Sequence, residues 1–209
     1  MSDKSNNTVL KFPEGFLWGT ATAAYQVEGG NMNADWWEWE HQKIKETRKQ
    51  SRREAVGTPT EASEENRERR RIGLKSIHNF EKGEEELFLS GKGPDHYHRY
   101  EEDFDIAKGM YNNAHRLSLE WSRIEPHEGI FDQQEIEHYR KVLLALRTRG
   151  MKSMVTLHHF TNPSWFARKG GWGKRKNVKY FLRYVERVVH EYADLVDFWI
   201  TVNEPNVYV

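Results

Sequence analysis

The stretch DFWITVNEP, Asp197 to Pro205, predicts the fold of this chain of 209 residues. Its aromatic and β-branched residues predict a buried strand. Pro205 lacks a backbone N–H and ends that strand, so Glu204 lies at its carboxyl end. Parallel α/β folds place their functional side chains at this end of the strands. Taken alone, Glu204 fits a solvated loop residue equally well, because carboxylates are usually exposed.

Strand-like and helix-like segments alternate upstream of this stretch. Strands are predicted from Phe12 to Gln26 and over 112–121, 152–159 and 197–202, and amphipathic helices over 96–110, 133–150 and 177–194. The residues expected on the buried sides of the helices are Tyr97, Tyr100, Phe104, Ile106, Ala107, Ile136, Tyr139, Val142, Leu143, Leu146, Phe181, Val185, Val188 and Val189. Gly150 is the expected stop of the second helix. This alternation predicts an α/β fold with four parallel strands.

The charge balance excludes a strongly charged partner. The chain has 32 basic and 32 acidic residues and a formal net charge of zero, so it has no field that would attract nucleic acid or an anionic membrane. No cysteine is present, which excludes disulfides and thiolate metal sites and fits a reducing compartment. The first residues show no apolar run of signal-peptide length, so we expect a cytoplasmic location.

A charged insert separates the first strand from the regular part of the chain. From about residue 41 to 94 the sequence is rich in both charge signs and poor in large apolar residues, which predicts a solvated helix or a mobile excursion. Within it, RERRR at Arg67–Arg71 raises the alternative of nucleic-acid binding. The glutamates between the arginines cancel the local field, so no nucleic-acid partner is expected.

Six blocks of the sequence together resemble one enzyme family. They are FPEGFLWGTATAAYQVEGG (12–30), DWWEWE (35–40), DHYHRYEEDFDIAK (95–108), AHRLSLEWSRIEP (114–126), VTLHHFTNPSWF (155–166) and WITVNEP (199–205). In this order they resemble glycoside hydrolase family 1, the retaining β-glycosidases built on a (β/α)8 barrel. A full barrel needs eight strands and about 250 residues. The resemblance therefore implies the N-terminal half of a TIM barrel.

The resemblance implies a catalytic role for Glu204. In WITVNEP it takes the place of the family's acid/base, which protonates the leaving oxygen of the scissile bond. The family's nucleophile is a glutamate on a later strand that this chain does not contain, so no nucleophile is assigned. Arg116 matches the arginine that contacts the nucleophile and keeps it ionised. The alternative for Arg116 is a buried structural ion pair.

The resemblance also implies four sugar-binding residues. Gln26, His159 and Asn203 match positions that bind the sugar in the innermost subsite, and Phe160 replaces an aromatic residue that is commonly Trp. Amides and imidazole donate and accept hydrogen bonds, as sugar hydroxyls require. Asn203 is expected to bond the 2-hydroxyl group, an interaction that strengthens in the transition state.

Histidine pairs and tryptophans suggest further roles. His158 and His159 are adjacent on a strand and point to opposite faces, and no carboxylate or cysteine completes a set with His96 and His98, so we expect no metal and no cofactor. Aromatic side chains fill cores and also stack on sugar rings. We expect Trp165 and Asn206 on the aglycone side, and Trp36, Trp37 and Trp121 in packing roles.

The predicted function is hydrolysis of β-glycosidic bonds, of the β-glucosidase type, by the acid/base half of a split or truncated barrel. The expected partners are a β-glycoside or oligosaccharide and a complementary C-terminal half, or a second copy of the chain, because a half-barrel exposes two sheet edges. Two alternatives are a catalytically silent sugar-binding or scaffold protein and a fragment without function. The sugar and the aglycone stay open.

Overall fold

The computed structural model describes residues 11–56 and 89–208. In these ranges the strands are β1 (Gly19–Ala21), β2 (Ala114–Ser118), β3 (Lys152–His158) and β4 (Phe198–Val202). The helices are α1 (Ala24–Val27), α2 (Asp35–Val56), α4 (His96–Gly109), α5 (Trp121–Ile124), α6 (Gln133–Thr148), α7 (Ser164–Arg168), the 3-10 helices η2 (Gly171–Gly173) and η3 (Arg175–Asn177), α8 (Val178–Tyr192) and α9 (Pro205–Tyr208).

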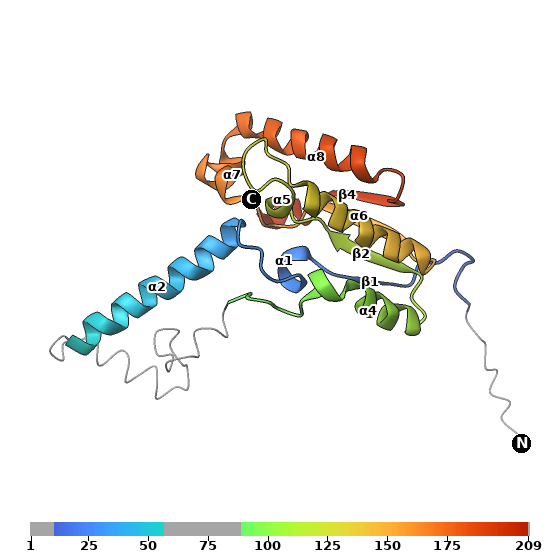
Figure 1. The fold of residues 1–209 in the computed structure, drawn as a ribbon, viewed down its shortest axis with the longest axis horizontal. Helices are drawn as coiled ribbons and strands as arrows, with labels where there is room; N and C mark the ends of the chain where they lie inside the picture. Colours follow the sequence, from blue (N-terminus) through green and yellow to red (C-terminus); the bar gives the residue numbers. More distant parts are fainter. Residues whose placement is uncertain (1–10, 57–88, 209) are drawn as a thin grey trace, which may run out of the picture.

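The strands form one parallel sheet in the order β1-β2-β3-β4 (Figure 1). Arg116 of β2 pairs with Met154 of β3, and Thr156 of β3 pairs with Ile200 of β4. The predicted four-stranded parallel sheet is therefore confirmed. Because all strands run the same way, the segments that follow them meet at one edge of the sheet, which we call the carboxyl edge.

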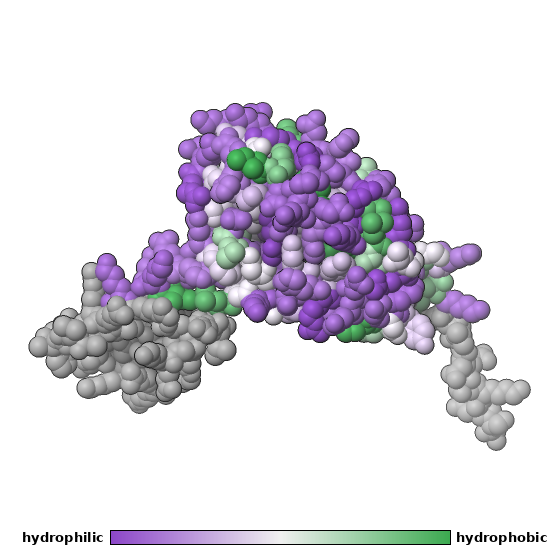
Figure 2. Space-filling model, in the orientation of Figure 1, coloured by the Kyte–Doolittle hydropathy of each residue, from purple (hydrophilic) through white to green (hydrophobic). Residues whose placement is uncertain are grey.

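The hydrophobic core lies between the sheet and the helices α4, α6 and α8 (Figure 1). Phe104 of α4, Leu143 of α6 and Tyr184 of α8 are completely buried and meet Val155 of the sheet in one cluster. The opposite sides of these helices face solvent, and Figure 2 shows a largely hydrophilic surface over this part of the molecule. The sequences of these helices are amphipathic because each helix packs one side against the sheet and exposes the other side to solvent.

Helix ends follow from local chemistry. Asp132 is the N-cap of α6, and its side chain accepts hydrogen bonds from the backbone N–H groups of Gln134 and Glu135. After α6 the chain turns at Gly150, which has a φ of +64° and donates its N–H to the carbonyl of Arg147. This left-handed conformation suits glycine, and the predicted stop is confirmed.

Of the fourteen helix residues predicted to be buried, nine are buried, four are partly buried and one is exposed. All five predicted residues of α6 have at most 3% of their surface exposed. Ile106 of α4 is 61% exposed, whereas Phe104 and Ala107 are buried. Two residues along a helix span about 200°, so Ile106 lies opposite Phe104 and the prediction for Ile106 was wrong.

The first strand is shorter than predicted. It ends at Ala21, and Gln26 lies in the short helix α1 rather than in a strand. The N–H of Ala24 donates to Ser118 Oγ at 2.8 Å, so the chain leaves the backbone ladder there and bends across the end of β2. Gln26 therefore approaches the carboxyl edge from a helical turn.

The start of the predicted insert is helical. α2 extends through Val56 and projects from the body of the molecule (Figure 1). Residues 57–88, which include Arg67–Arg71, lie outside the described residues, so the interpretation of this segment stays a prediction. Within the described ranges no helix combines the length and apolar character needed to span a bilayer.

Truncating a core leucine of α6 tests the packing. Leu143 is completely buried, whereas its neighbour Leu144 is 40% exposed. We expect Leu143→Ala to lower the free energy of unfolding by about 2 to 5 kcal/mol, because it removes buried methyl groups and leaves a cavity. Leu144→Ala is the matched control and should cost roughly 0.5 kcal/mol or less. Equal losses in urea unfolding would contradict the assigned core.

The buried imidazole of His115 predicts a pH dependence of stability. His115 Nδ1 lies 2.7 Å from Thr20 Oγ1, and the ring packs on Phe104. Burial, assisted by His96, lowers the pKa of His115 to about 4, against the weaker opposing effect of Asp103. The unfolded chain takes up this proton near pH 6.5, so stability should fall by roughly 1 to 3 kcal/mol as the pH drops from 6.5 to 4.

Urea unfolding at a series of pH values measures this dependence. The variant His115→Gln cannot take up the proton, so its stability should change less steeply between pH 6.5 and 4 than that of the wild type. The same slope in both proteins would show that other groups cause the dependence.

Candidate active site

Arg116 connects three strands at the carboxyl edge. Its Nε donates to Thr156 Oγ1 at 3.0 Å, and its Nη2 donates to Asn203 Oδ1 at 2.6 Å. The backbone N–H of Asn203 donates to the carbonyl of His158, which continues the β3–β4 ladder. Because Arg116 occupies the carboxamide oxygen of Asn203, the amide nitrogen is the end that can donate to a ligand.

Four of the sequence-predicted residues directly follow β3 and β4. His159 and Phe160 follow β3, and Asn203 and Glu204 follow β4. Asn203 is buried, His159 and Phe160 are partly buried, and Glu204 is exposed. The structure therefore groups a carboxyl group with several hydrogen-bonding side chains and one aromatic ring at the end of the sheet.

Two of these residues have an unusual backbone conformation. Phe160 has a φ of +71° and Glu204 a φ of +44°. A left-handed conformation is uncommon for side chains of this size and often marks a functional site, where the surrounding structure compensates for the strain. Pro205 begins α9 directly after Glu204, and its fixed φ suits the first position of a helix.

The electrostatic surroundings of His159 involve two other predicted residues. Burial lowers the pKa of His159, the Arg116 guanidinium lowers it further, and the Glu204 carboxylate opposes both. His159 is therefore neutral near pH 7, and the neutral ring has one donor and one acceptor nitrogen. That chemistry suits a sugar hydroxyl group.

The loop that carries His159 and Phe160 is held by side chains that sequence reasoning missed. Thr161 donates its hydroxyl to the buried carboxylate of Glu120 at 2.9 Å, and Asn162 donates its Nδ2 to Asp35 at 2.8 Å. Asp35 lies in the block DWWEWE and Glu120 in the block AHRLSLEWSRIEP. The pattern of apolar and polar residues in these blocks does not indicate either hydrogen bond. The partners are 127 and 41 residues apart along the chain.

A buried network supports the helical turn of Gln26. Glu28 accepts hydrogen bonds from Arg123 Nε at 3.0 Å and from the Tyr139 hydroxyl at 2.8 Å. Burial raises the pKa of Glu28 to about 7, although Arg123 and Tyr139 oppose the shift. Arg123 also donates to the carbonyl of Gly29. Gln26 itself is exposed.

The predictions for the tryptophans have mixed outcomes. Trp121 is 1% exposed, so its packing role is confirmed. Trp165 was expected on the aglycone side, but it is 8% exposed, belongs to the core and donates its indole N–H to the carbonyl of Glu125, so that prediction was wrong. Trp36 is 41% exposed, and Asn206 is exposed. Among the described residues no group of three acidic, histidine or cysteine side chains is arranged to hold a metal.

Comparison with known proteins identifies the family. The sequence profile of Glycosyl hydrolase family 1 matches residues 8–58 and 77–209. The chain belongs to this family. It is 31% identical to β-glucosidase A of Thermotoga maritima over an alignment of 201 residues, with 94% of this chain and 37% of the relative covered. It is 28% identical to a β-galactosidase of Pyrococcus woesei, with 95% of this chain and 42% of the relative covered.

Solved structures confirm the fold class. A β-glucosidase structure has 40% sequence identity and a TM-score of 0.69, with 92% of this chain and 38% of the other covered. A β-glycosidase from Pyrococcus horikoshii has 34% identity and a TM-score of 0.70, with 95% and 37% covered. The chain thus spans about two-fifths of the length of these relatives, and its four strands correspond to half of a TIM barrel.

The opposite effects of Arg116 and Glu204 on the pKa of His159 can be tested with two variants. Arg116→Gln removes a positive charge and should raise the pKa of His159, whereas Glu204→Gln removes a negative charge and should lower it. The His159 ring proton resonances, followed by NMR as a function of pH, report both shifts. Shifts in the same direction, or none, would contradict the arrangement of these three side chains.

Proposed function

We propose that the chain is the acid/base half of a retaining β-glycosidase of the β-glucosidase type. The observation that carries this proposal is Glu204 at the end of β4, close to Arg116, Asn203 and His159. The family membership supports the reaction class, and the hydrogen-bonding side chains around Glu204 suit a sugar.

In the proposed reaction Glu204 acts twice. As a carboxylic acid it protonates the leaving oxygen while a second carboxylate attacks the anomeric carbon and forms a covalent glycosyl-enzyme. As a carboxylate it then takes a proton from the water that hydrolyses this intermediate. Asn203 donates to the sugar 2-hydroxyl group, and Arg116 fixes the Asn203 side chain. Arg116 is also proposed to hold the second carboxylate in its ionised form.

The second carboxylate is proposed to come from a complementary C-terminal half of the barrel. β1 pairs only with β2, and β4 pairs only with β3, so both outer strands of the described sheet present an edge. Phe198 of β4 is 44% exposed. Unpaired edges and exposed apolar side chains favour association with further strands.

Reconstitution tests this proposal. The chain should hydrolyse aryl β-glycosides when mixed with a C-terminal half from a family member and should be inactive alone. Glu204→Gln should lower the turnover of the mixture by about 100-fold or more, because an amide cannot transfer the proton. Glu186→Gln changes an exposed carboxylate of α8 in the same way and should leave turnover unchanged.

Association must be measured in the same samples, for example by analytical ultracentrifugation. Hydrolysis that survives Glu204→Gln would contradict the role of Glu204. If both halves are folded and associated but show no hydrolysis, a catalytically silent sugar-binding or scaffold protein becomes the better account.

A further inference from the structure

The segment from α7 to the first turns of α8 has a strongly basic surface. Between Glu137 and Glu186 the sequence has no acidic residue and twelve basic ones, and seven of the twelve lie between residues 168 and 183. Three of these seven form ion pairs with carboxylates of other segments. The pairs are Arg168 with Glu38, Lys169 with Glu128, and Arg183 with Glu125. These carboxylates therefore neutralise only part of the surface.

Four cationic side chains remain, and we call them the basic patch. They are Lys174, Arg175, Lys176 and Lys179. All four are exposed, and no carboxylate among the described residues forms an ion pair with them. The first turn of α8 contains no acidic residue either. Because the four charges lie within six residues of sequence, they produce a local field that the net charge of zero does not reveal.

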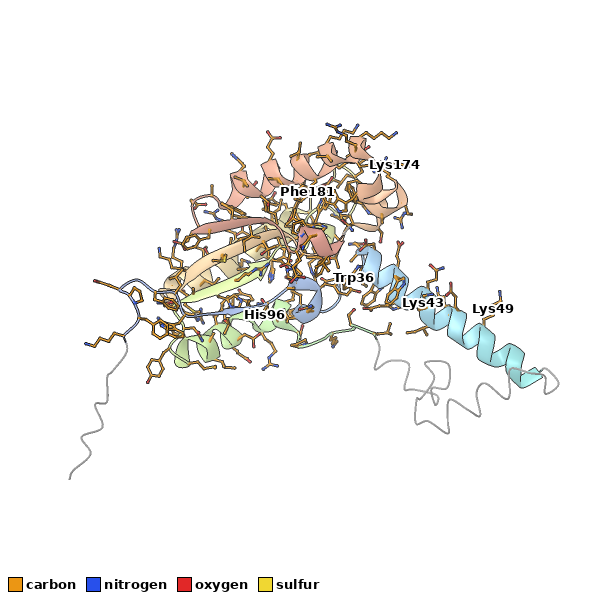
Figure 3. The ribbon with its side chains drawn as sticks, turned by 180° about the vertical axis from the view of Figure 1, so that it is seen from behind. Trp36, Lys43, Lys49, His96, Lys174 and Phe181 are labelled. Carbon is orange, nitrogen blue, oxygen red and sulfur yellow. The ribbon has the colours of Figure 1, made fainter. Side chains whose placement is uncertain are left out.

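A packed turn holds the basic patch in place. The ring of Trp172 packs on Phe181 with a centroid distance of 5.2 Å. Asn177 is buried and donates its Nδ2 to the carbonyl of Gly171 at 2.8 Å. Figure 3 shows Lys174 at the periphery of the molecule and Phe181 in its interior. The cations thus project from a fixed surface, which lowers the entropy cost of binding a ligand.

The same turn is attached to the loop of the candidate active site. Trp172 donates its indole N–H to Asn162 Oδ1 at 2.9 Å, and Asn162 lies in the loop that carries His159 and Phe160. Because the ring and the N–H of Trp172 are both used inside the protein, this indole is not available to stack on a nucleic-acid base. Recognition at the basic patch therefore rests on charge, beside a loop with proposed sugar-binding residues.

We propose that the basic patch binds an anionic polysaccharide, a chain of sugars that carry carboxylate or sulfate groups. Segments of roughly five to eight residues rich in lysine and arginine are typical of surfaces that bind nucleic acid or heparin-like glycans. Membership of a glycosidase family favours the glycan. The inference goes beyond the proposed function, because binding at this surface requires neither Glu204 nor hydrolysis.

Isothermal titration calorimetry of the chain with a heparin hexasaccharide at low salt tests the inference. The patch variant carries the changes Lys174→Gln, Arg175→Gln, Lys176→Gln and Lys179→Gln. Its dissociation constant should be at least ~10-fold higher than that of the wild type, because four ion pairs are lost. For the wild type, the logarithm of the binding constant should fall with the logarithm of the salt concentration with a slope of roughly −3, and the patch variant should show a shallower slope.

A variant with the same change in net charge is the matched control. It carries Lys45→Gln, Lys92→Gln, Lys108→Gln and Lys141→Gln, which are exposed lysines of other segments. Its dissociation constant should stay within about threefold of the wild-type value, because salt screens charges that are distant from the ligand. Both variants keep Arg67–Arg71, so a contribution of that segment is the same in both. Thermal unfolding shows that each variant is folded.

Three further ligands define the chemistry that the basic patch recognises. Oligogalacturonate carries carboxylates without sulfates, cellohexaose is uncharged, and a single-stranded oligonucleotide carries phosphates. Binding of heparin that the patch variant loses and the control variant keeps supports the inference, and the same result for oligogalacturonate extends it to carboxylates. Cellohexaose should show no difference between the wild type and the patch variant.

Three outcomes would overturn the inference. They are no binding of heparin to the wild type, equal losses in the two variants, and tighter binding of the oligonucleotide than of either anionic glycan through the patch. The last outcome would assign the surface to nucleic acid. None of them bears on the proposed function, because neither variant changes Glu204 or the residues around it.

Discussion

The hydrogen bonds of Arg116 to Thr156 and Asn203 are the constraint on which the candidate site depends. Arg116 lies in β2, Thr156 in β3 and Asn203 directly after β4, so one guanidinium links two strands to the residue that follows the third. A guanidinium has donors in fixed directions, and a lysine could not replace this pattern. The position of Glu204 follows from that of Asn203, because the two residues are adjacent and Pro205 starts the next helix.

Two further groups of buried and partly buried polar side chains hold the loops around this constraint. Glu28, Arg123 and Tyr139 lie beneath the helical turn of Gln26, and Asp35 with Asn162 holds the loop of Phe160. Buried charged and polar groups are costly unless they are paired, so these contacts leave each loop few alternative arrangements. Preorganised side chains bind a ligand with a smaller loss of conformational entropy.

The sequence predicted the fold well where periodicity decides burial. In α6 the apolar residues recur at helical spacing, and every residue predicted to be buried is buried. Prediction was poorer where contacts are long-range. The hydrogen bond from Arg116 to Asn203 joins residues 87 positions apart, and the bend after β1 depends on a hydrogen bond to Ser118. Helical or strand periodicity reveals neither of these contacts. Trp36 and Trp165 show the same limit, because residue type alone does not tell which of two tryptophans lies in the core.

The central claim is that Glu204 transfers the proton in glycoside cleavage. In the reconstituted enzyme, Glu204→Ala removes the carboxylate and leaves space that a small anion such as azide can enter. With an activated aryl β-glycoside, the account predicts that azide restores turnover and yields a glycosyl azide of retained configuration, since azide then attacks the glycosyl-enzyme without needing a general base. Full activity of Glu204→Ala without azide, towards substrates with poor leaving groups, would contradict the account.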